Sequence, residues 1–227
     1  MNIREYLADE TAGKLISAGM RLFGEYGFKG TTTRMIAREA ESNIGSIAYY
    51  FGNKRSFYLA IVSHIAERMR ERFRLDMISQ KESHMVGLTA EDAHVILKGM
   101  VRNMIQTFVV DDEASCWLLL VMREQANPTE AFDILYNEVF DSVYRILSRL
   151  IAVLAGLEHD HIRATLEAHT LIGQVVFFLV GRSSIVRRLG GKDGYSQEVI
   201  EIIEETILSH VNFFTRENFA SEYTSLK

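Results

Sequence analysis

Proline and cysteine each occur only once in the 227 residues of this chain. A single proline leaves long helices uninterrupted, because proline breaks the hydrogen-bond ladder of a helix interior. The single cysteine, Cys116, excludes an internal disulfide framework and a cysteine-rich zinc site. The longest apolar run, residues 171–180, is interrupted by Gln174 and is too short to span a bilayer. These shortages favour an all-α protein and exclude a disulfide-stapled or membrane-spanning one.

The motifs of common enzyme classes are missing as well. The sequence has no GxSxG, no GxGxxG after a strand, no GxxxxGK[ST] and no Cys–His pair in a recognisable context. His159 and His161 flank Asp160 at the start of an expected helix, where all three suit a solvated cap. Residues two apart on a helix do not face each other, so they make a poor zinc site. We therefore expect no enzyme, no metal and no cofactor.

The overall composition is that of a globular chain. Hydrophobic residues make up 48% and charged residues 24%, and the length suits one large domain or two small ones. Residues 1–4 lead into polar sequence, so we expect no signal peptide and a cytoplasmic protein without a membrane partner.

Charge is distributed unevenly along the chain. Residues 1–74 hold 12 Lys and Arg against 8 Asp and Glu, a net charge of +4. Residues 75–227 hold the remaining 13 and 22, a net charge of −9, and the two parts together give −5. A basic first part on an acidic second part is typical of a modular DNA-binding protein, although charge fluctuates along any chain.

Residues 31–54, TTTRMIAREAESNIGSIAYYFGNK, have the pattern of two short helices joined by a tight turn. Thr32 or Thr33 is placed to cap a helix over residues 33–40, and Asn43 to cap a second helix that ends at about residue 51. Such a pair is a helix-turn-helix, whose second helix lies in a DNA major groove.

Side chains around this turn suit contact with DNA. Arg34 is the strongest candidate for a base contact, because a guanidinium binds guanine O6 and N7 together. Tyrosine combines an apolar body with a hydroxyl for phosphate, and small residues let a groove wall come close. Core packing explains part of this pattern, but not the cluster of basic and tyrosine side chains. The predicted DNA-binding residues are Thr32, Thr33, Arg34, Asn43, Ile44, Gly45, Ser46, Ala48, Tyr49, Tyr50 and Lys54.

The same residues resemble the DNA-binding domain of a known family. Phe23 and Gly27, the pairs at 31–32 and 36–37, Ala40 and the run IGSIAYYFGNK are similar to the TetR family of bacterial transcription regulators. The pair at 43–44 and the run REQANPT at 123–129 are similar to a subgroup near the regulator of cephalosporin and chloramphenicol sensitivity. The resemblance implies a three-helix DNA-binding domain, an effector pocket in a helical body and a dimer through the last two helices.

The sequence departs from the family pattern at two positions. Glu41 stands where the turn usually has glycine, and Ile44 where many members have lysine or another polar residue. Ile44 predicts fewer phosphate contacts and suits contact with a thymine methyl group. Glu41 shapes the turn and is unfavourable near DNA.

We expect a DNA-binding domain over residues 1–55 and an effector-binding and dimerisation domain over residues 56–227, joined by a long helix over 53–77. A first helix is expected over residues 10–26, with an apolar inner stripe and with Gly27 after its end. Later helices are expected over residues 89–110, capped by Thr89, and from the cap at 111–113 through the run 114–122. Others are expected over 127–154, with Asn127 as its cap and Gly156 after its end, over 161–181 and over 195–218, with loops at 79–88 and 181–194. The run at 114–122 is apolar on all sides, which predicts burial.

Polar residues in apolar surroundings are the candidates for the effector pocket that the resemblance implies. They are Asn103, Gln106, Trp117, Arg123, Glu124, Gln125, His169 and Gln174. Each also has a structural interpretation. Arg123 and Glu124 suit a helix cap or an ion pair, Trp117 suits the core, and His169 suits a core histidine with a partner.

The last two expected helices carry apolar stripes. These stripes either pair with a second copy in a four-helix bundle or are buried within one subunit. The predicted dimer-interface residues are Gly173, Val176, Phe177, Val180, Ile203, Ile207, Val211 and Phe214.

Together these features predict a ligand-responsive transcription regulator. It would repress by binding a pseudo-palindromic operator as a homodimer and would be released by a small-molecule effector. The alternative is an all-helical dimeric interaction module whose first domain binds protein and not DNA, and salt dependence distinguishes the two.

Overall fold

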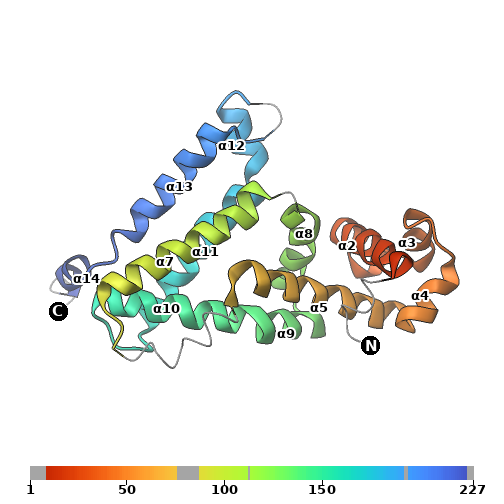
Figure 1. The fold of residues 1–227 in the computed structure, drawn as a ribbon, viewed down its shortest axis with the longest axis horizontal. Coiled ribbons are helices and arrows are strands. Elements are labelled where there is room, and N and C mark those ends of the chain that lie inside the picture. The colour runs from red at the N-terminus through yellow and green to blue at the C-terminus, as the bar shows by residue number, and fades with distance from the viewer. Residues whose placement is uncertain (1–8, 76–86, 112, 192–193, 224–227) are drawn as a thin grey trace. The chain divides into compact units, whose positions relative to one another are not determined.

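The computed structural model describes residues 9–75, 87–111, 113–191 and 194–223. Every regular element in these ranges is a helix, in agreement with the all-α prediction (Figure 1). The expected end of the linker helix at residue 77 and most of the loop expected over 79–88 lie outside the described residues.

Contacts between residues divide the chain into two units, which are described separately. The first unit covers residues 1–71 and 113–140, and the second covers 72–112 and 141–227. The first unit contains α2 (Glu10–Gly30), α3 (Thr33–Glu39), α4 (Ile44–Phe51), α5 (Lys54–Phe73, of which the last residues fall in the second unit), α8 (Glu113–Ala126), α9 (Glu130–Leu135) and the π-helix η3 (Tyr136–Phe140). The second unit contains α7 (Ala90–Ile105), the π-helix η2 (Gln106–Val110), α10 (Asp141–Ala155), α11 (Ile162–Val180), α12 (Arg182–Arg188), α13 (Gln197–Val211) and α14 (Arg216–Tyr223).

Helix α2 is the central element of the first unit. Its predicted inner stripe is buried throughout, and α2 packs along α8 as well as on α3 and α4. Phe23 and Phe57 of α5 are fully buried with ring centroids 6.0 Å apart. Burying one such side chain contributes about 1.5–3 kcal/mol. Gly19 lets α5 approach, because a Cβ there would lie 2.8 Å from the ring of Phe57.

Gly27 interrupts α2 as the sequence predicts. Its φ of 72° is outside the helical range and produces a kink, after which helical structure continues to Gly30. The kink is held by Thr31, which is fully buried and donates its hydroxyl to the carbonyl oxygens of Leu22 and Gly27, each at 2.9 Å. The predicted helix end at residue 26 is therefore a change of direction within α2.

The second unit is built around α10. Its inner face packs on α7 and α11, which lie alongside it in Figure 1, and η2 packs on α11. Helix α13 packs mainly on α7, to which it is tied by Arg102 and Glu204 at 2.8 Å. Gly156 ends α10 with a φ of 67°, as predicted.

The sequence misplaced several boundaries in the chain after residue 105. The helix expected over 127–154 consists of α9, η3 and α10, and Thr129 caps its start where Asn127 was expected. The loop expected over 181–194 contains α12, and the helix expected over 195–218 is divided into α13 and α14. The prediction that 114–122 is buried on all sides is wrong at Leu119 and Met122, whose exposed fractions are 56% and 38%.

Candidate DNA-binding site

Side-chain caps set the geometry of the helix-turn-helix. The Thr32 hydroxyl accepts a hydrogen bond from the Met35 N–H at 3.2 Å at the start of α3, and the Asn43 side chain accepts from the Gly45 N–H at 2.9 Å at the start of α4. Both caps were predicted. Glu41 in the turn has a φ of 50°, a left-handed conformation that glycine adopts without strain. This explains why glycine is usual there and shows that Glu41 shapes the turn under strain.

Helix α4 presents a broad exposed face. Ile47 and Phe51 are buried and hold the helix against the first unit, whereas Ile44 is 49% exposed and Tyr49 is 83% exposed. The remaining exposed members of the predicted set on this helix and its cap are Asn43, Gly45 and Ala48, and Ser46 is half-buried. Small side chains beside one large exposed tyrosine suit close approach to a groove.

Arg34 lies in the first turn of α3, next to the half-buried Thr33. A cation at a helix N-terminus is unfavourable because the helix dipole is positive there. Within the described residues Arg34 is exposed and has neither an ion-pair nor a hydrogen-bond partner. Its position therefore serves contact with an anionic partner better than it serves the helix.

Tyr50 has an internal role that the sequence did not reveal. Its hydroxyl donates to Asp9 at 2.9 Å, and Asp9 also caps α2 by accepting from the Thr11 and Ala12 N–H groups. The Ala12 N–H, and next the Tyr50 hydroxyl, lower the pKa of the Asp9 carboxyl below its usual 3.8. Asp9 is recognisable as a cap in the sequence, but its partner 41 residues away is not.

Lys54 is the first residue of α5, following Asn53, whose side chain accepts from the Ser56 N–H at 2.9 Å. The ammonium nitrogen of Lys54 lies 4.4 Å from the centroid of the Phe28 ring. Partial burial lowers the pKa of this ammonium group from its usual value. The Phe28 ring thus fixes the position of a cation near the start of α5.

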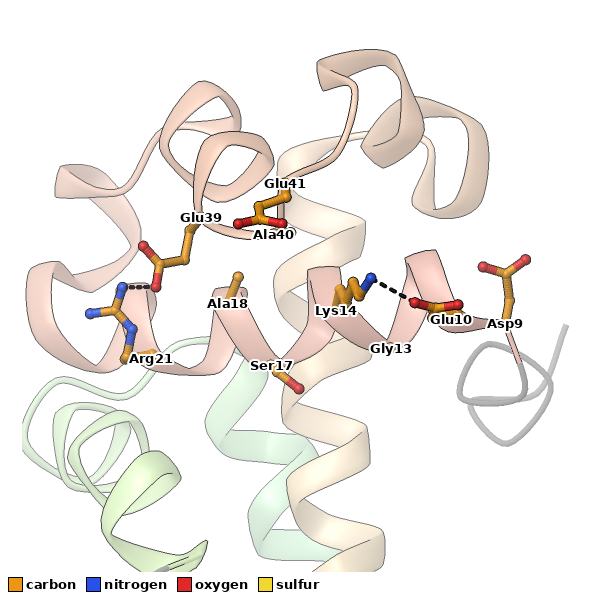
Figure 2. A pocket seen from close by; sticks show the side chains of 10 residues that line it. All are labelled: Asp9, Glu10, Gly13, Lys14, Ser17, Ala18, Arg21, Glu39, Ala40 and Glu41. Carbon is orange, nitrogen blue, oxygen red and sulfur yellow. Dashed lines mark hydrogen bonds and ion pairs between the residues drawn. The ribbon is translucent and has the colours of Figure 1, made fainter.

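A groove of about 610 Å³ on the first unit is lined by an excess of acidic side chains. It lies between α2 and the end of α3, and Figure 2 shows the side chains of both helices that line it. The carboxylates are Asp9, Glu10, Glu39 and Glu41. Its two cations are already paired, Lys14 with Glu10 at 2.6 Å and Arg21 with Glu39. The groove therefore holds two more carboxylates than cations, an excess of negative charge that is unfavourable next to phosphate.

The predicted effector residues do not form one described cluster. Trp117, Arg123, Glu124 and Gln125 belong to the first unit, and Asn103, Gln106, His169 and Gln174 belong to the second. Trp117 is buried, and Arg123 and Glu124 make hydrogen bonds within the first unit, as their structural interpretation predicts. In the second unit His169 contacts the Tyr144 hydroxyl at 2.5 Å, and Gln174 contacts His210 at 2.9 Å.

The predicted dimer residues divide by exposure. On α11, Phe177 is 70% and Val180 53% exposed, Gly173 is exposed and Val176 is half-buried. The α13 stripe and the residue that follows it face the interior of the second unit. The buried residues are Ile203, Ile207, Val211 and Phe214. The structure thus supports burial within one subunit for α13 and leaves only the α11 residues on the surface.

The described residues hold neither a metal-binding cluster nor a single membrane-spanning helix. No group of three or more His, Cys, Asp or Glu side chains there is arranged to hold a metal ion. No single helix among them is long and apolar enough to cross a membrane, while α11 and α12 together, bent by 69°, meet the length and composition criteria.

The fold and this exposed face define a helix-turn-helix DNA-binding protein. The family described as bacterial regulatory proteins of the tetR family matches residues 15–61, and the C-terminal domain of the HTH-type transcriptional dual regulator CecR matches residues 93–217. The chain belongs to the TetR family of transcription regulators, in the subgroup of CecR. It is a DNA-binding regulator with an effector-binding domain, and not an enzyme.

Individual relatives agree with this assignment. The chain is 32% identical over 207 residues to the dual regulator CecR of Shigella flexneri, covering 90% of this chain and 91% of that protein. A Rhodococcus transcriptional regulator has the same fold with a TM-score of 0.58 and 15% identity, over 90% of this chain and 97% of that one. The structure of AibR in complex with isovaleryl coenzyme A and operator DNA also has a TM-score of 0.58, with 16% identity over 89% and 97% of the two chains.

Proposed function

We propose that this regulator is a repressor that binds a pseudo-palindromic operator as a homodimer and is released by a small-molecule effector. The observation that carries the proposal is the exposed face of the helix-turn-helix, where Arg34 has no internal partner in the described chain and Tyr49 projects from α4. Its site of action is the cytoplasm, where the chromosomal DNA lies.

The proposed contacts divide into positioning and reading. Thr32, Tyr49 and Lys54 bind phosphates and fix the register of the protein on the duplex. Arg34 and the exposed residues of α4 approach base edges, with Ile44 against a thymine methyl group. A bidentate Arg34 contact is worth about 1–3 kcal/mol of discrimination against the wrong base.

Dimerisation is proposed through the exposed apolar side of α11. Ile162, Leu166, Phe177 and Val180 are each more than half exposed and recur at helical spacing along one side, with Gly173 between them. A second copy related by a two-fold axis would cover this stripe with its own. Two helix-turn-helix units would then reach half-sites about 34 Å apart, as a pseudo-palindrome requires.

Effector binding is proposed in the second unit. Asn103, Gln106, His169 and Gln174 lie on or next to α7 and α11, which both pack on α10. Structures of this fold with an acyl coenzyme A ligand, the Bacillus subtilis FadR with stearoyl-CoA and AibR with isovaleryl coenzyme A, support control by a small molecule but do not name this one. The ligand releases DNA if it binds the non-binding geometry more tightly.

The DNA-binding step is tested by fluorescence anisotropy with a duplex that covers the DNA flanking the protein's own gene. We expect tight binding that weakens steeply as salt rises, because each neutralised phosphate releases a counterion. Arg34→Ala should lower affinity about 5- to 150-fold, whereas Arg188→Ala, an exposed arginine on α12, should not. Binding that is absent or independent of salt would contradict the proposal.

The dimer and the sign of regulation need separate measurements. Phe177→Glu places a charge in the proposed interface, so sedimentation velocity should show monomers, and operator affinity should fall. A dimer that persists in this variant would place the interface elsewhere.

The sign of regulation is tested with a reporter gene under the flanking promoter. Expression of the reporter should rise when the gene of the regulator is deleted. A fall would identify activation, which the description of the Shigella relative as a dual regulator allows for that protein.

A further inference from the structure

Glu124 at the end of α8 is a carboxylate buried in the first unit, with only 4% of its surface exposed. One oxygen accepts from the Tyr58 hydroxyl at 2.5 Å, and the other accepts from the Thr129 N–H at 3.1 Å and the Thr129 hydroxyl at 2.8 Å. A buried carboxylate is tolerated only when its oxygens are satisfied in this way. Burial, and next the hydrogen bond to Glu124, raise the pKa of the Tyr58 phenol and keep it protonated as a donor. Glu124 therefore ties the turn between α8 and α9 to α5.

The preceding residue, Arg123, reaches α2. Its Nε donates to the carbonyl oxygen of Gly24 and its Nη2 to that of Glu25, both at 2.8 Å. These carbonyls lie just before the kink at Gly27, where the regular helical bonding is interrupted. Cations are favourable at carbonyl ends of helices. Two consecutive residues of α8 thus hold the two helices that flank the helix-turn-helix in sequence.

A chain of ring contacts continues from Glu124 to the start of α5. The Tyr58 ring packs edge-on against Phe28, with centroids 5.2 Å apart, and against Phe23 at 4.9 Å. Lys54 in turn lies 4.4 Å above the Phe28 ring. The hydrogen bonds of Glu124 are therefore connected by packed side chains to a cation at the proposed DNA surface.

We propose that Arg123 and Glu124 are positioning residues for operator binding. They fix α2 and the start of α5, and hence Lys54 and the helix-turn-helix, in the orientation that DNA requires, without touching DNA themselves. When either residue is removed, the helices sample several orientations, and the apparent affinity falls by the fraction that remains competent. Because both residues lie on α8, displacement of this helix would disturb Lys54 and α2 together. The proposal rests on the operator-binding function proposed above.

The competing interpretation is that these bonds only stabilise the fold. Tyr58→Phe distinguishes the two, because it removes a single hydroxyl and keeps the ring on Phe28. Glu124→Gln keeps the shape of the side chain and one acceptor oxygen. Glu204→Gln is the matched control, since Glu204 forms an interhelical pair with Arg102 in the second unit.

The experiment measures operator affinity by fluorescence anisotropy across a salt series, and urea unfolding of each variant, with the duplex from the gene's own flanking DNA. We expect Tyr58→Phe and Glu124→Gln to lower affinity at least tenfold where the protein is fully folded. The salt dependence should become shallower by about two counterions per dimer, as one phosphate contact in each subunit is misplaced. Glu204→Gln should change neither the operator affinity nor its salt dependence.

Affinity and salt slope within twofold of wild type, with only the unfolding midpoint lowered, would overturn the positioning role. If Glu124→Gln fails to fold, Tyr58→Phe alone decides the question. Failure of the proposed function is seen separately, because the wild-type protein itself would then show no salt-dependent binding.

Discussion

The exposed side of the helix-turn-helix and the corner between α8 and α9 use polar side chains in opposite ways. Arg34 is exposed without a partner in the described chain, and Tyr49 is 83% exposed. Glu124 accepts three hydrogen bonds and Arg123 donates two, all within the first unit. Groups left without internal partners are available to another molecule, whereas groups that are fully bonded fix geometry. The comparison separates the residues proposed to bind DNA from the residues proposed to position them.

The largest expected effect is on stability, at the α8–α9 corner. Glu124→Ala leaves the Tyr58 hydroxyl and the Thr129 N–H without their acceptor, so we expect a loss of about 2–4 kcal/mol in the free energy of unfolding. Urea unfolding followed by circular dichroism measures it. Gln125→Ala, at the exposed neighbouring position, should change stability by less than about 0.5 kcal/mol. Equal losses in both variants would remove the distinction between the two residues.

The next largest effects are expected from substitutions of the adjacent Tyr49 and Tyr50 on α4. Tyr49→Phe removes an exposed hydroxyl and should lower operator affinity about fivefold, near 1 kcal/mol for one hydrogen bond, with stability unchanged. Tyr50→Phe removes the donor to Asp9 and should lower the unfolding midpoint, with a smaller effect on affinity. Anisotropy and urea unfolding on both variants test the pair. The reverse pattern would show that Tyr50 is the tyrosine that contacts DNA.

A smaller effect, a gain in stability, is expected from a substitution at Glu41 in the turn between α3 and α4. Glu41→Gly relieves a left-handed conformation in a non-glycine residue and should raise the free energy of unfolding by about 0.5–1 kcal/mol. It also removes a carboxylate beside the helix-turn-helix, so operator affinity should rise. Glu41→Ala is the control, because it removes the charge but keeps the strain. A more stable Ala variant would show that charge, and not backbone conformation, disfavours Glu41.

The smallest expected effect is on the pH dependence of stability below neutral pH. The folded-state pKa of Asp9 is lowered, so its cap stabilises the protein above the usual value of 3.8 and loses that contribution as pH falls through the folded pKa. The difference in unfolding free energy between wild type and Asp9→Ala should therefore shrink as pH falls from about 6 to about 3. A difference that is constant with pH would show that the carboxylate charge is not involved.

Local signals in the sequence predicted the helix-turn-helix well. Thr32, Asn43 and Thr89 were expected as caps, and the structure places each at a helix start, because such side chains bond to N–H groups two or three residues away. Asn127 failed as a cap because Thr129, bonded to Glu124, begins the helix instead. The functional division at residue 55 and the DNA, effector and dimer residues stay predictions.

The sequence did not predict which residues far apart along the chain come into contact. The Tyr58–Glu124 bond joins residues 66 apart, and the sequence showed only that Glu124 was a polar residue in apolar surroundings. The stripe on α13 was identified as apolar, but nothing in its periodicity tells an internal partner such as α7 from a second subunit.

The docking of Arg123 on α2 has a consequence for modularity. Its donors bind main-chain carbonyl oxygens at Gly24 and Glu25, which every amino acid carries, and so they recognise the path of the chain and not the identity of its side chains. A first domain from another regulator would keep these two bonds to α8 if its first helix kept a kink where Gly27 now stands and a surface that packs on α8. Operator preference would then be exchanged as a cassette while ligand response stayed with the recipient.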